Sequence, residues 1–198
     1  MAREWVLPPV APFDRKKSRS REEKTVATIT EKLERYELKR TLTVKALSKV
    51  AVFAALYTVL VWLFQPFGFA ALQFRVAEGL KPSIAKVRTL AVAFAIGNFL
   101  GNLVSPFAGI YELAFMPTMN IVGGLLAYYA AKIFKGNYFV AALVYGTTIG
   151  LSVSWMLHAL FNIPLLDLIP FLLASELIAM ILGAVAFLFL EKRWKWYQ

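Results

Sequence analysis

Long apolar stretches, separated by short polar or basic segments, dominate the chain from about Ala46 onward. A helix that crosses a bilayer needs about 20 predominantly apolar residues. This pattern predicts an all-α, polytopic membrane protein. The second predicted span is short and carries four residues unusual in such a helix, namely Arg75, Glu78, Lys81 and Pro82. The six transmembrane helices that we predict lie at about 45–64, 72–87, 89–104, 112–133, 138–160 and 167–190.

The segment before the first apolar stretch has a different composition. Residues 1–24 are rich in proline and then in Lys and Arg, which is typical of a disordered segment. From about Thr25 onward, a capping-box sequence at 28–31 predicts an amphipathic helix. Met1–Val10 contains two prolines and no apolar core, so we expect no signal peptide. We therefore divide the chain into a basic cytoplasmic extension, a transmembrane substrate-binding domain and a cytoplasmic tail, at 1–44, 45–192 and 193–198.

Composition and charge agree with a membrane location. Hydrophobic residues make up 59% of the chain and charged residues 17%, whereas soluble domains have about 25% charged residues. The net charge of +10 could indicate nucleic acid, but the basic residues flank apolar stretches, so we predict no nucleic-acid partner. With six spans, the predicted outer segments, 65–71, 105–111 and 161–166, contain no Lys or Arg. The positive-inside rule then places both termini in the cytoplasm of a cell-membrane protein. The basic residues of the inner segments beyond the N-terminal block are Lys86, Arg88, Lys132, Lys135, Lys192, Arg193 and Lys195.

Several polar side chains interrupt the apolar body at a similar predicted depth. An ionisable group within the hydrocarbon costs a few kcal/mol or more, and it usually faces a cavity or a partner. These residues come from five predicted spans and lie in the outer half or near the midplane. They predict a polar pocket that opens outward. The set comprises Arg75, Glu78, Asn98, Asn102, Glu112, Asn120, His158 and Glu176.

Structural alternatives exist for most of this set. Arg75 and Glu78 stand at i,i+3 and could pair with each other. Asn98 and Asn102 share a helix face and could bond only a neighbouring helix. His158 follows Trp155 by one turn and could lie at the membrane interface. Glu112, like Asp167 outside this set, lies at or near an outer boundary, where solvation or N-terminal helix capping is favourable, and for Asp167 we prefer the cap. Glu176 lies in an apolar stretch and is the hardest to explain structurally, so we favour a role in ligand binding.

No catalytic or metal-binding motif is visible in the sequence. The chain has no HExxH, no GxSxG and no Walker-type lysine motif. It has one histidine and no cysteine, so we expect neither a transition-metal site nor a cofactor. We predict that the protein is not an enzyme and that any active transport must draw on an energy source supplied by a partner.

Four segments resemble the queuosine-precursor (QueT-type) S components, the substrate-binding subunits of energy-coupling factor (ECF) transporters. Residues 72–80 resemble the QFR-[IV]-[SA]-E-x-L signature of that family, and residues 97–106 its G-x-x-x-x-N-L-x-S-P segment. Ser175-Glu176 is similar to its Gly-Glu in the last span, and residues 50–57 to its Ala-rich opening. The resemblance covers about 45–190. The chain departs from the family at 112–117, where it keeps a carboxylate but lacks the Gly-Ser-like small residues.

The resemblance implies an ABC-type importer for nutrient uptake, in which six helices bind a small molecule near the outer face. It also implies an ECF module of two ATPases and a transmembrane coupling protein. Small residues of the first span, Ala51 and Ala55, would form the docking face, although internal packing is an equal alternative.

A 7-deazaguanine ring presents an N–H and an amino group side by side, which one carboxylate can accept together. The carboxylate candidates are Glu78, Glu112 and Glu176, and a cationic aminomethyl tail would require a second carboxylate. Arg75 would hold one of these glutamates in place. Further candidates for ligand contacts are Gln73, Asn98, Asn102 and Asn120 for the polar ring atoms, and Phe74 and Trp155 for stacking.

Two other functions remain open at this point. The altered 112–117 region permits an S component for another small nutrient or vitamin. A non-transporting membrane scaffold, whose basic N-terminus recruits a soluble partner, is the alternative from a different class.

Overall fold

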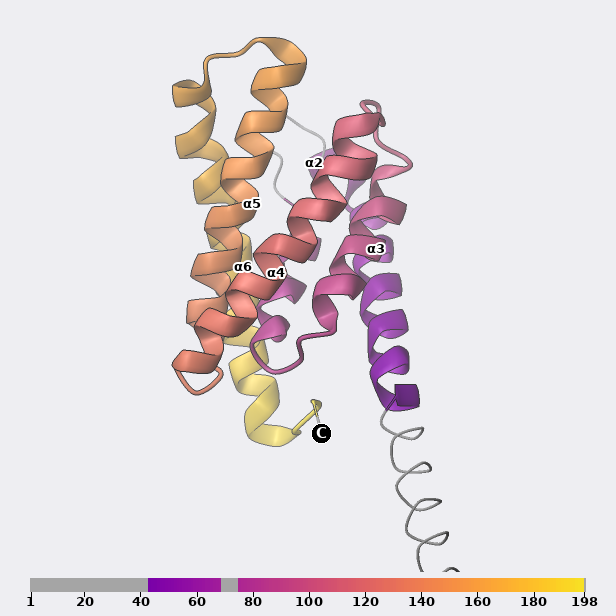
Figure 1. Ribbon diagram of the computed structural model, residues 1–198, viewed down its shortest axis with the longest axis vertical. Coiled ribbons are helices and arrows are strands. Elements are labelled where there is room, and N and C mark those ends of the chain that lie inside the picture. The colour runs from indigo at the N-terminus through magenta and orange to yellow at the C-terminus, as the bar shows by residue number, and fades with distance from the viewer. Residues whose placement is uncertain (1–42, 69–74, 198) are drawn as a thin grey trace, which may run out of the picture. The chain divides into compact units, whose positions relative to one another are not determined.

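The computed structural model of the protein describes residues 43–68 and 75–197, so the predictions for residues 1–42 lie outside the described part. The chain divides into two units, Met1–Lys45 and Ala46–Gln198. The second unit contains nearly all the described residues, which form helices and no strand. Figure 1 shows these helices running up and down beside one another. They are the first helix (Thr43–Leu63), α2 (Gln65–Gly68), the 3-10 helix η1 (Val76–Ala85), α3 (Leu90–Asn102), the π-helix η2 (Tyr111–Phe115), α4 (Met116–Ile133), α5 (Tyr138–Phe161) and α6 (Leu165–Arg193).

Four helices of the described part are long and apolar enough to cross a membrane. They are the first helix, η2 with α4, α5 and α6, and their bounds agree with the predicted spans to within a few residues. Helix α3 is apolar but has only 13 residues, about 20 Å at 1.5 Å per residue. The all-α membrane fold is therefore confirmed in outline.

The second predicted span differs from its prediction. Residues 76–85 form a ten-residue 3-10 helix rather than a long α-helix. Pro82 explains part of this difference, because its ring clashes with the preceding turn of an α-helix and it has no N–H to donate. At about 2 Å per residue, η1 extends only about 20 Å and cannot cross a hydrocarbon core of about 30 Å by itself.

Helix η1 lies in the interior of the unit, where it packs against α4, α5 and α6. Seven of its ten residues are buried. Its approach to α6 is closest at two glycines, where a Cβ on Gly183 would lie 1.9 Å from the carbonyl oxygen of Gly79. The first helix and α3 also approach closely, since a Cβ on Gly97 would lie 2.9 Å from the Cβ of Tyr57.

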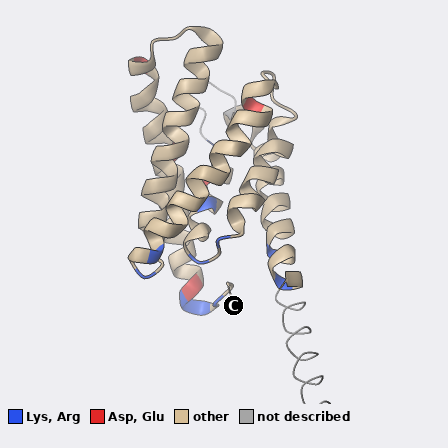
Figure 2. Ribbon diagram, viewed as in Figure 1, with Lys and Arg blue, Asp and Glu red and all other residues tan. Residues whose placement is uncertain are grey.

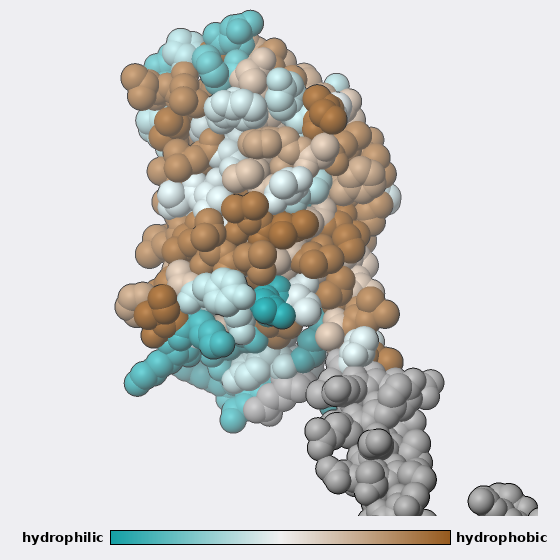
Figure 3. Space-filling view, in the orientation of Figure 1, coloured by the Kyte–Doolittle hydropathy of each residue, from teal (hydrophilic) through white to brown (hydrophobic). Residues whose placement is uncertain are grey.

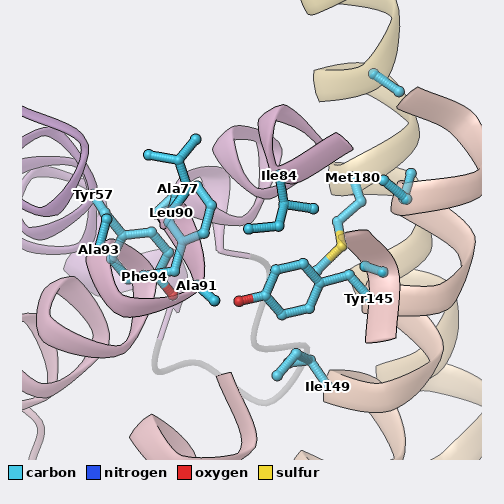
Figure 4. Packing of buried hydrophobic residues seen from close by; sticks show 14 of the residues in the cluster. Tyr57, Ala77, Ile84, Leu90, Ala91, Ala93, Phe94, Tyr145, Ile149 and Met180 are labelled. Atoms are coloured by element: carbon cyan, nitrogen blue, oxygen red, sulfur yellow. The ribbon is translucent and has the colours of Figure 1, made fainter. Parts of the chain in front are cut away.

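Aromatic side chains fill the core around η1. Tyr57, Phe94 and Tyr145 are completely buried. Figure 4 shows Ile84 and Met180 beside the Tyr145 ring, whose hydroxyl is directed toward Ala91. The Phe94 ring lies 6.0 Å from that of Tyr57 and 6.3 Å from that of Tyr145. These contacts join the first helix, α3 and α5 around the short central helix.

The surface is apolar where a membrane protein contacts lipid. Many large hydrophobic side chains are exposed, among them Leu63, Leu126, Leu166 and Phe189. Figure 3 shows hydrophobic side chains over most of one face, with hydrophilic ones gathered near its ends. Lys and Arg gather toward the end of the unit where the C-terminus lies (Figure 2). An apolar exterior of this kind is typical of helical membrane proteins.

Candidate binding site

Five charged side chains are buried among the described residues of the second unit. Because a buried charge is costly unless it is paired and hydrogen-bonded, their partners determine what the site can do. Three buried asparagines, Asn98, Asn102 and Asn120, lie in the same interior. The five charged residues are Arg75, Glu78, Lys81, Glu112 and Glu176, with exposed fractions of 6%, 1%, 0%, 1% and 4%. We call them the buried charge cluster.

The geometry of η1 aligns two members of this cluster, and a third precedes it. In a 3-10 helix, residues three apart lie directly above one another, so Glu78 and Lys81 project from one side. Arg75 is the N-cap residue of the helix, with extended backbone. The charges at 75, 78 and 81 thus alternate in sign along this segment.

Glu78 and Lys81 form an ion pair at the centre of the unit. The Tyr57 hydroxyl donates a hydrogen bond to Oε1 of Glu78. The Lys81 ammonium also lies over two aromatic rings, 5.5 Å from the centroid of Tyr57 and 5.1 Å from that of Tyr145. Ion pairing and cation–π contacts together offset the cost of burying this lysine completely.

Arg75 connects η1 to α3 and η2. Its guanidinium lies 3.8 Å from Oε1 of Glu112 and donates a hydrogen bond to Oδ1 of Asn102 at 3.3 Å. Asn102 in turn donates to the Glu112 carbonyl oxygen at 3.2 Å and to Oδ1 of Asn98 at 3.5 Å. Asn98 and Asn102 thus belong to a polar network that also includes Arg75 and the Glu112 carboxylate. Their role is therefore not limited to bonding a neighbouring helix.

Asn120 is held by protein groups on both sides of its side chain. Its Nδ2 donates to the Met116 carbonyl oxygen at 2.9 Å, one turn earlier in α4. The Tyr145 hydroxyl lies 2.8 Å from the Asn120 carbonyl oxygen and 3.3 Å from Oδ1. These bonds fix α4 against α5 beside the buried charge cluster.

Glu176 enters the cluster from α6. It interacts electrostatically with Glu78, Lys81 and Arg75. Its Oε2 is buried and has no hydrogen-bond partner within the described part of the chain, and the same holds for Oε2 of Glu112. Oε2 of Glu78 also accepts no hydrogen bond among the described residues, but it is paired with the Lys81 ammonium. The Oε2 atoms of Glu112 and Glu176 are therefore candidates for accepting hydrogen bonds from a ligand.

Two predicted site residues lie at the surface. Trp155 is 44% exposed, and its ring packs against Tyr111 and Phe115, with centroids 5.9 and 4.9 Å away. His158 is exposed, and its Nδ1 lies 2.7 Å from the carbonyl oxygen of Ile163, just beyond the end of α5. Their part in ligand binding stays a prediction. Gln73 and Phe74 lie outside the described residues.

Three residues of the site were missed by the sequence analysis, namely Tyr57, Lys81 and Tyr145. The three-residue spacing from Glu78 is a signal that identifies Lys81, once the segment is read as a 3-10 helix. Nothing in the sequence around the two tyrosines distinguishes them from ordinary core aromatics.

A model of the QueT transporter family matches residues 47–192, which include the whole buried charge cluster. The chain belongs to the QueT transporter family. The resemblance expected from the sequence is thereby confirmed, and the protein is a component of a membrane transporter. Searches of curated proteins and of solved structures found no match. Within this QueT-family chain, the buried charge cluster is the leading candidate for the binding site.

Proposed function

We propose that this QueT-family protein is the substrate-binding S component of an ECF-type importer, and that its substrate is a queuosine precursor with a 7-deazaguanine ring. The observation that carries this proposal is the buried charge cluster, in which Oε2 of Glu112 and Oε2 of Glu176 have no hydrogen-bond partner among the described residues. Charged residues at such depth are characteristic of substrate pathways. Membership of the QueT family supports the substrate class.

The available oxygens fit the ring chemistry. The N–H and amino group on one edge of a 7-deazaguanine require a carboxylate that is free to accept them. Glu112 and Glu176 each have such an oxygen, whereas Glu78 is occupied by Lys81 and Tyr57. Asn98 and Asn102 lie beside Glu112 and could serve the ring carbonyl.

Mass spectrometry of the small molecules that co-purify with the detergent-solubilised protein tests the substrate class. We expect a 7-deazaguanine in near-stoichiometric amount. Recovery of a chemically unrelated vitamin at that occupancy would favour the alternative S component. The membrane-scaffold alternative predicts that no small molecule stabilises the protein.

We further propose that the chain crosses the membrane six times, with both termini in the cytoplasm. Short segments such as η1 and α3 would then cross together with their flanking residues. Reporter fusions at Gln198 and in the loop at 162–164, between α5 and α6, provide the measurement. We expect a cytoplasmic signal from the first fusion and an external signal from the second. A C-terminal reporter outside the cell would contradict this topology.

We also propose that the coupling protein docks on the first helix at Ala51 and Ala55. Both residues are exposed, so they are available to a partner rather than used in packing within the described chain. Their neighbours Val52 and Leu56 line an apolar hollow of about 400 Å³ that Trp194 and Trp196 also border. Small residues at i,i+4 allow another helix to approach closely.

Replacing both alanines with leucine should prevent isolation of the complete transporter while leaving ligand affinity unchanged. Co-purification with the ATPases and the coupling protein, followed by calorimetry, separates these two effects. Ala159→Leu is the matched control, since Ala159 is exposed on a different helix, α5. An intact complex from the double variant would place the docking surface elsewhere.

A further inference from the structure

A cavity of about 350 Å³ lies at the end of the second unit where Lys and Arg gather (Figure 2). Its walls are formed by Lys86 at the end of η1, the turn 134–137 between α4 and α5, the start of α5 and the last turns of α6. No residue of the buried charge cluster lines it. It is therefore a separate cavity, which the proposed substrate does not occupy.

The turn between α4 and α5 packs directly on the end of η1. Lys135 and Gly136 have left-handed backbone, with φ of 57° and 75°, and so reverse the chain between the two helices. A Cβ on Gly136 would lie 3.4 Å from the Ala85 carbonyl oxygen and 3.4 Å from Nζ of Lys86. Lys86 and Lys135 thereby line the same cavity, although they are far apart in the sequence.

The charges around this cavity do not cancel. Lys86 pairs with Glu191 at 3.0 Å, and the Glu191 carboxylate also accepts a hydrogen bond from the Tyr197 hydroxyl at 2.8 Å. Lys135 is exposed and forms no ion pair with a carboxylate of the described residues. Because lysine keeps its proton at neutral pH, the lining residues carry one net positive charge. A group with a single negative charge complements it.

The N-terminus of α5, beside the cavity, already has hydrogen-bond acceptors within the protein. Oδ1 of Asn137 accepts hydrogen bonds from the N–H groups of Phe139 and Val140, at 2.8 and 3.3 Å. The attraction for an anion therefore comes from the Lys135 side chain rather than from the helix end.

Three of the lining residues are exposed hydrophobic side chains. Phe134, Phe139 and Leu188 are 60%, 37% and 38% exposed. A small soluble anion at Lys135 would leave these side chains uncovered, whereas a phospholipid would place its phosphate at the lysine and an acyl chain against them. Basic pockets between transmembrane helices bind anionic lipid headgroups in this way.

We propose that this cavity binds an anionic phospholipid, with the headgroup phosphate at Lys135 and an acyl chain against Phe134, Phe139 and Leu188. A zwitterionic headgroup is less suitable, because its own ammonium would lie near that of Lys135. This lipid site goes beyond the transport function and does not depend on the identity of the substrate.

Native mass spectrometry tests the proposal on the full-length protein in detergent, titrated with dioctanoyl phosphatidylglycerol or dioctanoyl phosphatidylcholine. The first lipid bears one net negative charge and the second none. The wild-type protein should bind phosphatidylglycerol at least about fivefold more tightly, which is the contribution of one basic residue near a membrane surface. Glycerol 3-phosphate, which has no acyl chain, should bind at least about tenfold more weakly than phosphatidylglycerol, because it cannot cover the apolar residues.

Three variants locate the lipid. Lys135→Gln should reduce the preference for phosphatidylglycerol to within about twofold, and it should remain folded because the side chain is exposed. Lys195→Gln is the matched control, since Lys195 is an exposed lysine near the C-terminus that does not line the cavity, and it should keep the preference. Leu188→Trp keeps every charge but fills part of the cavity, so it should weaken the binding of both lipids.

Equal wild-type affinity for the two lipids would overturn the proposal, because the headgroup charge would then not be selected. Equal losses in Lys135→Gln and Lys195→Gln, or unchanged binding in Leu188→Trp, would mean that the basic surface as a whole attracts the lipid and that the cavity does not hold it. Glycerol 3-phosphate bound as tightly as phosphatidylglycerol would make this a site for a soluble phosphate, which also contradicts the proposal.

Discussion

Replacing Gly183 with alanine is expected to abolish the native packing of η1 on α6. The added Cβ would lie 1.9 Å from the carbonyl oxygen of Gly79 and 2.6 Å from its carbonyl carbon. Both are backbone atoms, so no side-chain rotation relieves the clash, and the two helices must separate. Overpacking typically costs 1–3 kcal/mol, and a backbone clash of this severity should cost about 3 kcal/mol or more.

The separation would also disturb the site, because Gly79 directly follows Glu78 and α6 carries Glu176. We therefore expect little folded protein in size-exclusion chromatography, and no ligand-dependent stabilisation of what remains. Gly109→Ala is the matched control, since its Cβ would meet only the Phe107 carbonyl oxygen at 3.7 Å. Normal yield and thermal stability of Gly183→Ala would mean that η1 and α6 are farther apart than described.

Replacing Lys81 with methionine is expected to destabilise the protein by about 3–5 kcal/mol, because it leaves Glu78 buried without its cation. Methionine keeps the apolar length of the side chain, so the loss reports mainly on the charge. The contact of the ammonium with the rings of Tyr57 and Tyr145 is lost as well. Thermal unfolding in detergent is the measurement.

The double variant Lys81→Met with Glu78→Gln should regain part of the stability, since the unpaired charge is then removed. Lys86→Met provides a matched control at a partly exposed ion pair, where Lys86 and Glu191 lie 3.0 Å apart with side chains 18% and 22% exposed. Its cost should not exceed about 1 kcal/mol. A Lys81→Met variant as stable as Lys86→Met would show that the central ion pair is not formed.

The long helices could be predicted from the sequence because each is an apolar stretch of sufficient length. The prediction of 138–160 matches α5 at Tyr138–Phe161, and that of 112–133 matches η2 with α4. The 3-10 form of η1 could not be predicted in this way. It depends on Pro82 and on the close approach of Gly79 to α6, and the second of these is a tertiary contact.

The sequence was sufficient to predict which residues form the candidate site, but not which of them pair with one another. Polar residues in apolar spans identified Arg75, Glu112 and Glu176 individually, and the structure buries all three. The pairing of Arg75 with Glu112 joins η1 to η2, 37 positions along the sequence, and no local spacing specifies it. Lys81 was overlooked because an α-helical reading of its segment does not align it with both Arg75 and Glu78.

The most direct test of the account is calorimetric titration of the folded, ligand-free protein with a 7-deazaguanine. The account predicts saturable binding with one ligand per chain, accompanied by a higher unfolding temperature as ligand concentration increases. The absence of both binding and stabilisation, in protein that remains folded and saturably binds another nutrient, would contradict it.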